Sequence, residues 1–123
     1  MSRRIRSLCL SIAALILSAT YSFEAFAHAI LESSQPGNGA TIAAGDISFQ
    51  LTYNSRIDPT RSVIALTLPD QSKTKLAIAA GTAPNVLAST QHLTAGSYVL
   101  HWQVLSVDGH ITRGQISFTV QGQ

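Results

Sequence analysis

Three residues near the two ends of the sequence carry groups that could bind a metal ion. Asp108-Gly109-His110 places a carboxylate and an imidazole two positions apart, and side chains at that spacing in extended chain point the same way. His28 follows the stretch 25–27, whose A-x-A pattern is typical of the site where an export signal is removed. Cleavage there would make His28 the first residue, and its α-amine and imidazole Nδ1 could then chelate one ion.

The metal that such a set predicts is Cu(II), which prefers tetragonal coordination by nitrogen and oxygen. An α-amine has a pKa of about 7.7–8.0, well below that of lysine, so it gives up its proton to a metal near neutral pH. We therefore predict a Cu(II) site formed by His28, Asp108 and His110. Each motif also has an ordinary explanation, because Asp-Gly is a common hairpin turn and any exported chain must begin with some residue.

Residues 1–27 have the organisation of a secretory signal peptide. Three arginines within the first seven residues precede an apolar run from Leu8 to Ala19, which is short for a membrane span of about 20 residues. We predict that this segment is removed after Ala27 and that the protein is periplasmic, with no stable membrane insertion after cleavage. An uncleaved membrane anchor is the alternative.

The remaining segment, residues 28–123, has the size of one small domain. It holds five Lys or Arg and five Asp or Glu, with no cluster of basic residues that could neutralise phosphates, which argues against a nucleic-acid partner. The only cysteine, Cys9, and the only methionine, Met1, both lie in the leader. The domain therefore has no disulfide and no soft sulfur ligands for a Cu(I) site.

Hydrophobic alternation in this domain has the period of β-strands, and no window has a helical period. Residues 47–53 are one clear strand, where apolar residues alternate with polar ones, and the patterns at 98–105 and 115–120 are the strongest. Turn-forming residues at 33–39 and a break at 54–59 separate it from its neighbours. Short strands at this spacing predict an all-β fold, an antiparallel β-sandwich of six or seven strands. The other predicted strands cover 29–31, 63–68, 75–78, 86–93, 98–105 and 115–120.

Two longer motifs resemble the CopC family of periplasmic copper-binding proteins. The opening stretch 28–40 reads His-Ala, a hydrophobic residue, then Ser-x-Pro-x-x-Gly-Ala, and the stretch 98–120 is similar to the closing signature of the family. The resemblance implies an immunoglobulin-like, Greek-key sandwich or barrel of about seven strands and Cu(II) held by His28, Asp108 and His110. It also implies a carrier or buffer in copper homeostasis or resistance, with a CopD-like inner-membrane copper transporter as partner.

The sequence departs from that family in two places. Members often carry an acidic residue in a Phe-Ser-Glu-Pro-like segment, but here residues 53–57 read Tyr-Asn-Ser-Arg-Ile, so we expect no carboxylate ligand from this loop. Some members also have a methionine-rich Cu(I) site, which this domain lacks.

Two other classes of function compete with a copper carrier. A histidine-brace enzyme, such as a lytic polysaccharide monooxygenase, uses a similar N-terminal histidine, but this domain is small and lacks loop aromatics for gripping a polysaccharide. A metal-free structural module is the second alternative. No motif frames Ser62 as a hydrolase nucleophile. We expect His92 and His101 to be surface or edge residues, and Arg113 either to pair with a carboxylate or to be solvated.

Overall fold

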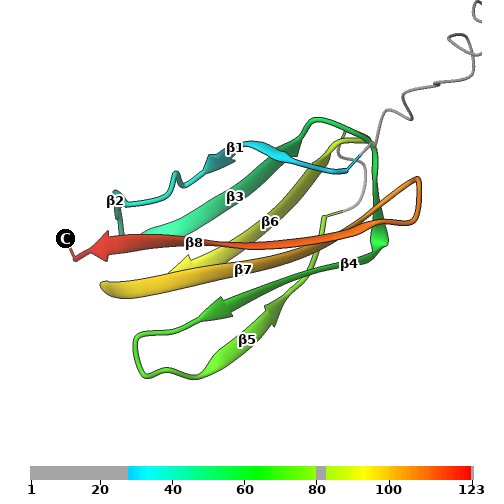
Figure 1. The fold of residues 1–123 in the computed structure, drawn as a ribbon. Coiled ribbons are helices and arrows are strands. Elements are labelled where there is room, and N and C mark those ends of the chain that lie inside the picture. The colour runs from blue at the N-terminus through cyan, green and yellow to red at the C-terminus, as the bar shows by residue number, and fades with distance from the viewer. Residues whose placement is uncertain (1–27, 80–82, 123) are drawn as a thin grey trace, which may run out of the picture.

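Eight strands form two sheets packed face to face in the computed structural model, which describes residues 28–79 and 83–122 (Figure 1). One sheet has the order β1-β3-β6 and the other the order β2-β8-β7-β4-β5. The predicted signal peptide, residues 1–27, lies outside the described residues. The bounds of the strands are β1 Leu31–Gln35, β2 Ala40–Ala43, β3 Gly45–Tyr53, β4 Ile57–Thr67, β5 Lys73–Leu76, β6 Val86–Leu93, β7 Gly96–Ser106 and β8 Ile111–Gln121.

The predicted all-β sandwich is confirmed, with eight strands in place of about seven. The additional strand is β2, which pairs with β8 and is parallel to it, whereas the other pairings are antiparallel. Residues 33–35, expected in a turn, belong to β1, and β4 begins at Ile57, inside the expected break. Both errors concern polar stretches at sheet margins, where pairing with a neighbouring strand decides the conformation and composition says little.

The core lies between the sheets and is filled by the inward-facing side chains, which alternate with outward-facing ones along each strand. Tyr98, Leu100, Trp102 and Val104 of β7 are buried, as their spacing predicts. Gly114 is required opposite this row, since a Cβ atom there would lie 2.4 Å from the Trp102 ring. None of the described residues forms a helix long and apolar enough to cross a membrane.

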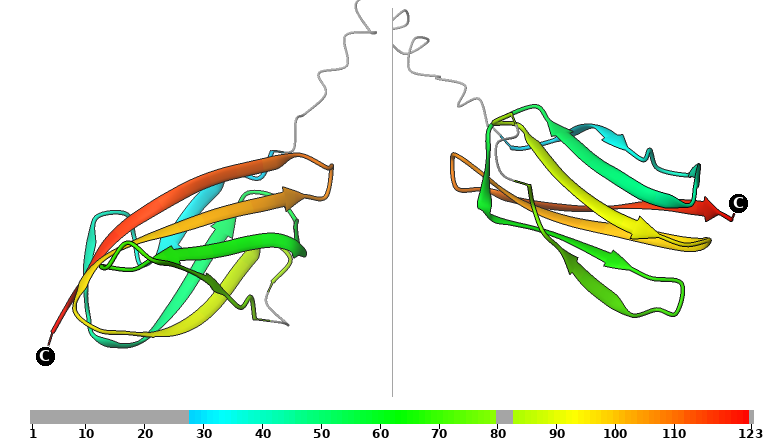
Figure 2. Two further views of the ribbon diagram at one scale, coloured as in Figure 1. Left: turned by 90° about the horizontal axis from the view of Figure 1, so that it is seen from below. Right: turned by 180° about the vertical axis from the view of Figure 1, so that it is seen from behind.

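Three segments far apart in the sequence meet at one end of the sandwich. Residues 28–30 precede β1, residues 54–56 join β3 to β4, and residues 107–110 join β7 to β8. Two further views show the start of β1 beside the β7–β8 turn, with the C-terminus at the opposite end (Figure 2). The fold therefore brings the two motifs of the predicted copper site to the same end.

Candidate metal centre

The turn between β7 and β8 fixes the backbone of the Asp-Gly-His motif. The N–H of Ser106 donates to the carbonyl of His110 at 2.9 Å, and the N–H of Gly109 donates to the carbonyl of Ser106 at 3.0 Å. Gly109 has a φ of 90°, in the left-handed region that favours glycine. Asp108 and Gly109 thus lie in a hairpin turn, which presents Asp108 and His110 together at its tip.

The carboxylate of Asp108 is held by its neighbours in the turn. Its Oδ1 accepts hydrogen bonds from the Ser106 hydroxyl and, at 3.2 Å, from the His110 N–H. Its Oδ2 lies 3.0 Å from Nδ1 of His110. The Ser106 hydroxyl, followed by the contacts with His110, lowers the pKa of Asp108 from 3.8 to about 2. Asp108 therefore offers an oriented, anionic oxygen to a metal ion at neutral pH.

The imidazole of His28 lies against that of His110. The ring centroids are 4.5 Å apart, with the planes at 73°. Ala29, the next residue, is buried, and its carbonyl accepts a hydrogen bond from the Thr112 hydroxyl at 2.8 Å. Because Thr112 lies in β8 and two positions after His110, this bond ties the segment before β1 to the hairpin that carries the other two predicted ligands.

The three predicted site residues thus come together as two contacting pairs that share His110. Within residues 28–79 and 83–122, no group of three or more His, Cys, Asp or Glu side chains is already arranged to hold a metal ion. In the 123-residue chain the nitrogen of His28 is still a peptide nitrogen, so the predicted amine ligand does not yet exist. The donors fit a tetragonal Cu(II) ion in kind, because they are two imidazoles and one carboxylate.

His92, His101 and Arg113, which we did not predict to bind the metal, have hydrogen-bond partners away from this site. His92 Nδ1 lies 2.8 Å from Asp46 Oδ1, and both side chains are exposed. His101 Nε2 lies 2.9 Å from the Thr67 hydroxyl. The Nε–H of Arg113 donates to Gln103 Oε1 at 2.7 Å, so a neutral amide is its hydrogen-bond partner.

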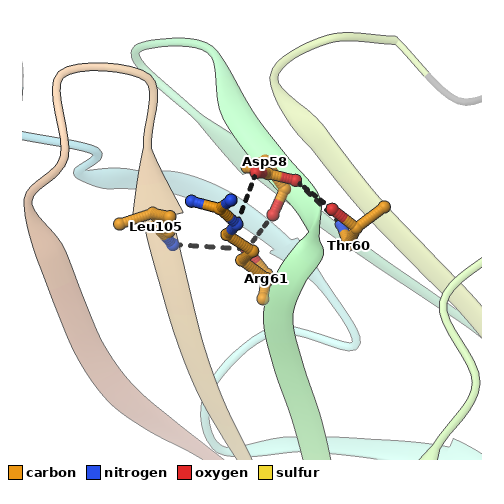
Figure 3. A network of polar contacts seen from close by, with 5 residues as sticks. Asp58, Thr60, Arg61 and Leu105 are labelled. Carbon is orange, nitrogen blue, oxygen red and sulfur yellow. Dashed lines mark hydrogen bonds and ion pairs between the residues drawn. The ribbon is translucent and has the colours of Figure 1, made fainter.

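The hydroxyl of Ser62 makes structural hydrogen bonds within the sheet. Its buried hydroxyl donates to the carbonyl of Asp58 at 2.6 Å and accepts the N–H of Leu105 at 3.3 Å. These bonds lie at the irregular start of β4, where the Asp58 carboxylate also accepts from Thr60 (Figure 3). The serine that does contact Asp108 is Ser106, whose buried hydroxyl donates hydrogen bonds to the Asp108 carboxylate and to the backbone carbonyl of His110, not to a histidine ring.

Sequence reasoning missed three residues around this centre: Ser106, Asn54 and Thr112. Ser106 stands two positions before Asp108, a spacing at which a hydroxyl can reach an Asp side chain across a turn, so a local signal existed. Asn54 and Thr112 act on residues 29 and 30, far from them in sequence. Only the folded chain brings these partners together.

The sequence was also compared with known families and proteins. The CopC domain model matches residues 31–121. This chain belongs to the CopC family. Copper resistance protein C of Xanthomonas campestris pv. juglandis is 32% identical over 116 residues, which cover 87% of this chain and 91% of that protein. Protein YobA of Escherichia coli K12 is 27% identical over 100 residues, which cover 78% and 81%.

Solved structures of CopC proteins have the same fold. CopC from Methylosinus trichosporium OB3b superposes with a TM-score of 0.71 at 29% identity, covering 78% of this chain and 96% of that one. PcoC from Escherichia coli gives a TM-score of 0.65 at 28% identity, covering 77% and 100%. PcoC is described as a methionine-rich copper resistance protein, whereas Met1 is the only methionine here.

Proposed function

We propose that this CopC-family chain is a periplasmic Cu(II) carrier or buffer that serves copper homeostasis or resistance. The domain of residues 28–123 would bind the ion after residues 1–27 are removed, through the His28 amine and imidazole, Asp108 and His110. The observation that carries the proposal is the 4.5 Å approach of the His28 and His110 rings, with the Asp108 carboxylate 3.0 Å from His110. Residues from the two ends of the domain's sequence thus lie side by side, and each carries a group that can bind Cu(II).

The donor set favours Cu(II) over Cu(I). Amine, imidazole and carboxylate groups suit Cu(II), whereas thiolate and thioether ligands select Cu(I). Residues 28–123 contain no cysteine or methionine, so this domain offers no sulfur ligand. A single nitrogen- and oxygen-rich site therefore binds Cu(II) without a paired Cu(I) site.

Binding and release, and not catalysis, account for this arrangement. A copper enzyme that activates oxygen needs an open coordination position, and the Asp108 carboxylate would occupy one. The copper-loaded domain should therefore release no oxidised oligosaccharides from cellulose or chitin in the presence of ascorbate. Their appearance would replace the carrier with a histidine-brace monooxygenase.

The position of the site at one end of the sandwich suits transfer of copper to another protein. The large exposed hydrophobic residues of the described chain are the chain neighbours of the site residues or lie two positions away: Ile30, Val107 and Ile111. A CopD-like inner-membrane copper transporter is the acceptor that the family resemblance implies. Transfer is tested by loading the domain with Cu(II) and measuring copper uptake by vesicles that contain such a transporter, with apo protein plus ionic copper as control.

The decisive experiment compares the domain beginning at His28 with one carrying a single additional residue before it. Electron paramagnetic resonance of the Cu(II)-loaded proteins should give a tetragonal spectrum with several nitrogen couplings for the former. The extension converts the amine to an amide, so the spectrum should change and the affinity should fall. Identical spectra and affinities would contradict the proposed ligand set, and affinity no greater than that of an unrelated histidine-containing domain would favour a metal-free structural module.

A further inference from the structure

The segment that carries His28 lies outside the strand ladder. β1 begins at Leu31, where its partner is Tyr53, and the register shifts between Leu31 and Ser33. His28 therefore stands three positions before the first residue of an edge strand whose pairing is already irregular there. Chain ends in such a position fray unless other contacts tie them down.

Asn54, the residue after β3, makes two hydrogen bonds to the backbone of Ile30, one to its N–H and one to its carbonyl. Its side-chain Oδ1 accepts the Ile30 N–H at 2.8 Å, and its own backbone N–H donates to the Ile30 carbonyl at 3.0 Å. The Ile30 side chain is 61% exposed, so it adds little packing of its own. Hydrogen bonds are thus the main contacts that fix this residue.

Thr112 holds the preceding residue from the other sheet. Its hydroxyl donates to the Ala29 carbonyl at 2.8 Å. Ala29 and Ile30 are therefore tied to β8 and to the β3–β4 connection respectively, and His28 is attached directly to the anchored pair. The two anchors restrict where the imidazole of His28 can go relative to His110.

We propose that Asn54 is a positioning residue for the N-terminal copper ligand, with Thr112 as its second support. This inference rests on the proposed function. When only a fraction of the molecules is competent to bind, the apparent dissociation constant is the intrinsic constant divided by that fraction. By keeping residues 29 and 30 in place, Asn54 raises the fraction of metal-free molecules in which His28 already stands beside His110 and Asp108.

Asn54 can perform this role without being needed for folding. Its side chain is exposed, and its Oδ1 serves the N-terminal segment. Asn85 provides a matched control, because its side-chain amide also makes a hydrogen bond between loop and strand, to the Tyr53 carbonyl at 3.0 Å, without a hydrogen bond to residues 29 or 30. Asn85→Ala should therefore affect local stability and leave the N-terminal segment in place.

The first measurement uses metal-free protein that begins at His28. Backbone heteronuclear NOE values at Ala29 should fall in Asn54→Ala and in Thr112→Val, and stay at the parent value in Asn85→Ala. Asn54→Asp keeps an oxygen acceptor for the Ile30 N–H, so it should restore the parent value. This readout does not depend on copper.

The second measurement is Cu(II) affinity in competition with a chelator. Losing one net hydrogen bond to the anchored segment should weaken binding about three- to tenfold in Asn54→Ala. The double variant with Thr112→Val should bind more weakly still, and Asn85→Ala should bind like the parent. The nitrogen couplings of the copper spectrum should broaden in the double variant because His28 is less well placed.

The outcomes separate this inference from the proposed function. A parent protein that binds no Cu(II) would overturn the function, while the NOE values would still show whether Asn54 orders residue 29. A parent that binds Cu(II) with unchanged affinity in Asn54→Ala would overturn the positioning role, even if residue 29 became mobile. Unchanged NOE values in both single variants would overturn the anchoring itself.

Discussion

Two histidine–aspartate pairs lie at opposite ends of this sandwich, and only one has the surroundings of a metal site. Nδ1 of His110 lies 3.0 Å from Asp108, and Nδ1 of His92 lies 2.8 Å from Asp46. By distance alone the second pair is the closer one. Its side chains are 69% and 79% exposed, against 48% and 29% for His110 and Asp108.

The difference lies in what surrounds each pair. Asp46 and His92 are cross-strand neighbours in the regular β3–β6 ladder, on the outer face of the sheet. Asp108 and His110 lie in a turn where a buried serine hydroxyl and a backbone N–H fix the carboxylate, and a second imidazole packs against the first. A preorganised carboxylate and convergence with a distant residue distinguish a candidate site from a surface ion pair.

Removing one histidine from each pair gives the largest expected contrast. His110→Ala deletes an imidazole ligand and should reduce Cu(II) affinity by about 100-fold or more, beyond the range expected for the loss of an outer-shell partner. His92→Ala should leave the affinity unchanged. Competition titration of the domain beginning at His28 measures both, and equal losses in the two variants would erase the distinction between the pairs.

Changing the two aspartates should give a smaller contrast of the same sign. Asp108→Asn removes the anionic oxygen but keeps an amide of similar shape, so we expect affinity to fall about 10-fold, less than for the loss of an imidazole. Asp46→Asn is the matched control and should bind copper as the parent does. An Asp108→Asn protein with parental affinity and spectrum would show that this carboxylate only supports His110.

Much of the fold could be predicted because strand alternation is a local signal. β3 and β7 have regularly alternating sequences, and both were predicted as strands close to their observed bounds. β2 was missed because four residues, Ala-Thr-Ile-Ala, have too little pattern, and their pairing with β8 is a long-range event. The start of β4 was missed because Pro59 and a register shift disguise a strand that continues through them.

In the candidate site, too, local features could be predicted from the sequence and long-range contacts could not. Residue type and spacing indicated His28, Asp108 and His110, and folding does bring them to one end. The residues that orient them could not be inferred in the same way, because Asn54 and Thr112 act through hydrogen bonds to the backbone of Ala29 and Ile30. Almost any sequence supplies such backbone groups, so nothing in the local pattern marks their partners.

Two buried serines, Ser106 and Ser89, allow the surroundings of the two histidine–aspartate pairs to be compared directly. Ser106→Ala removes the hydroxyl that most lowers the Asp108 pKa, so this pKa should rise toward its ordinary value and the free energy of unfolding should fall by about 1 kcal/mol. Ser89, on the strand that carries His92, donates to the Ala77 carbonyl at 2.7 Å. Ser89→Ala should cost a similar free energy without moving the Asp108 pKa, measured by NMR titration of the carboxyl carbon. A parental Asp108 pKa in Ser106→Ala would refute the serine's role.

Because the folded domain lowers the pKa of Asp108, acid should slightly reduce the stability that this carboxylate contributes. The Asp108 pKa is lowered in the folded domain to about 2 from 3.8, so below pH 3.8 the unfolded chain takes up a proton that the folded chain does not. The contribution of this carboxylate is complete above that value and is lost as pH falls toward about 2. Urea unfolding of metal-free parent and Asp108→Asn at several pH values should therefore show a stability difference that shrinks on acidification. Asp58 and Asp70, whose pKa values are also lowered, are present in both proteins and cancel from the difference. A difference that stays constant down to about pH 2 would mean that the turn does not favour the charged form of Asp108.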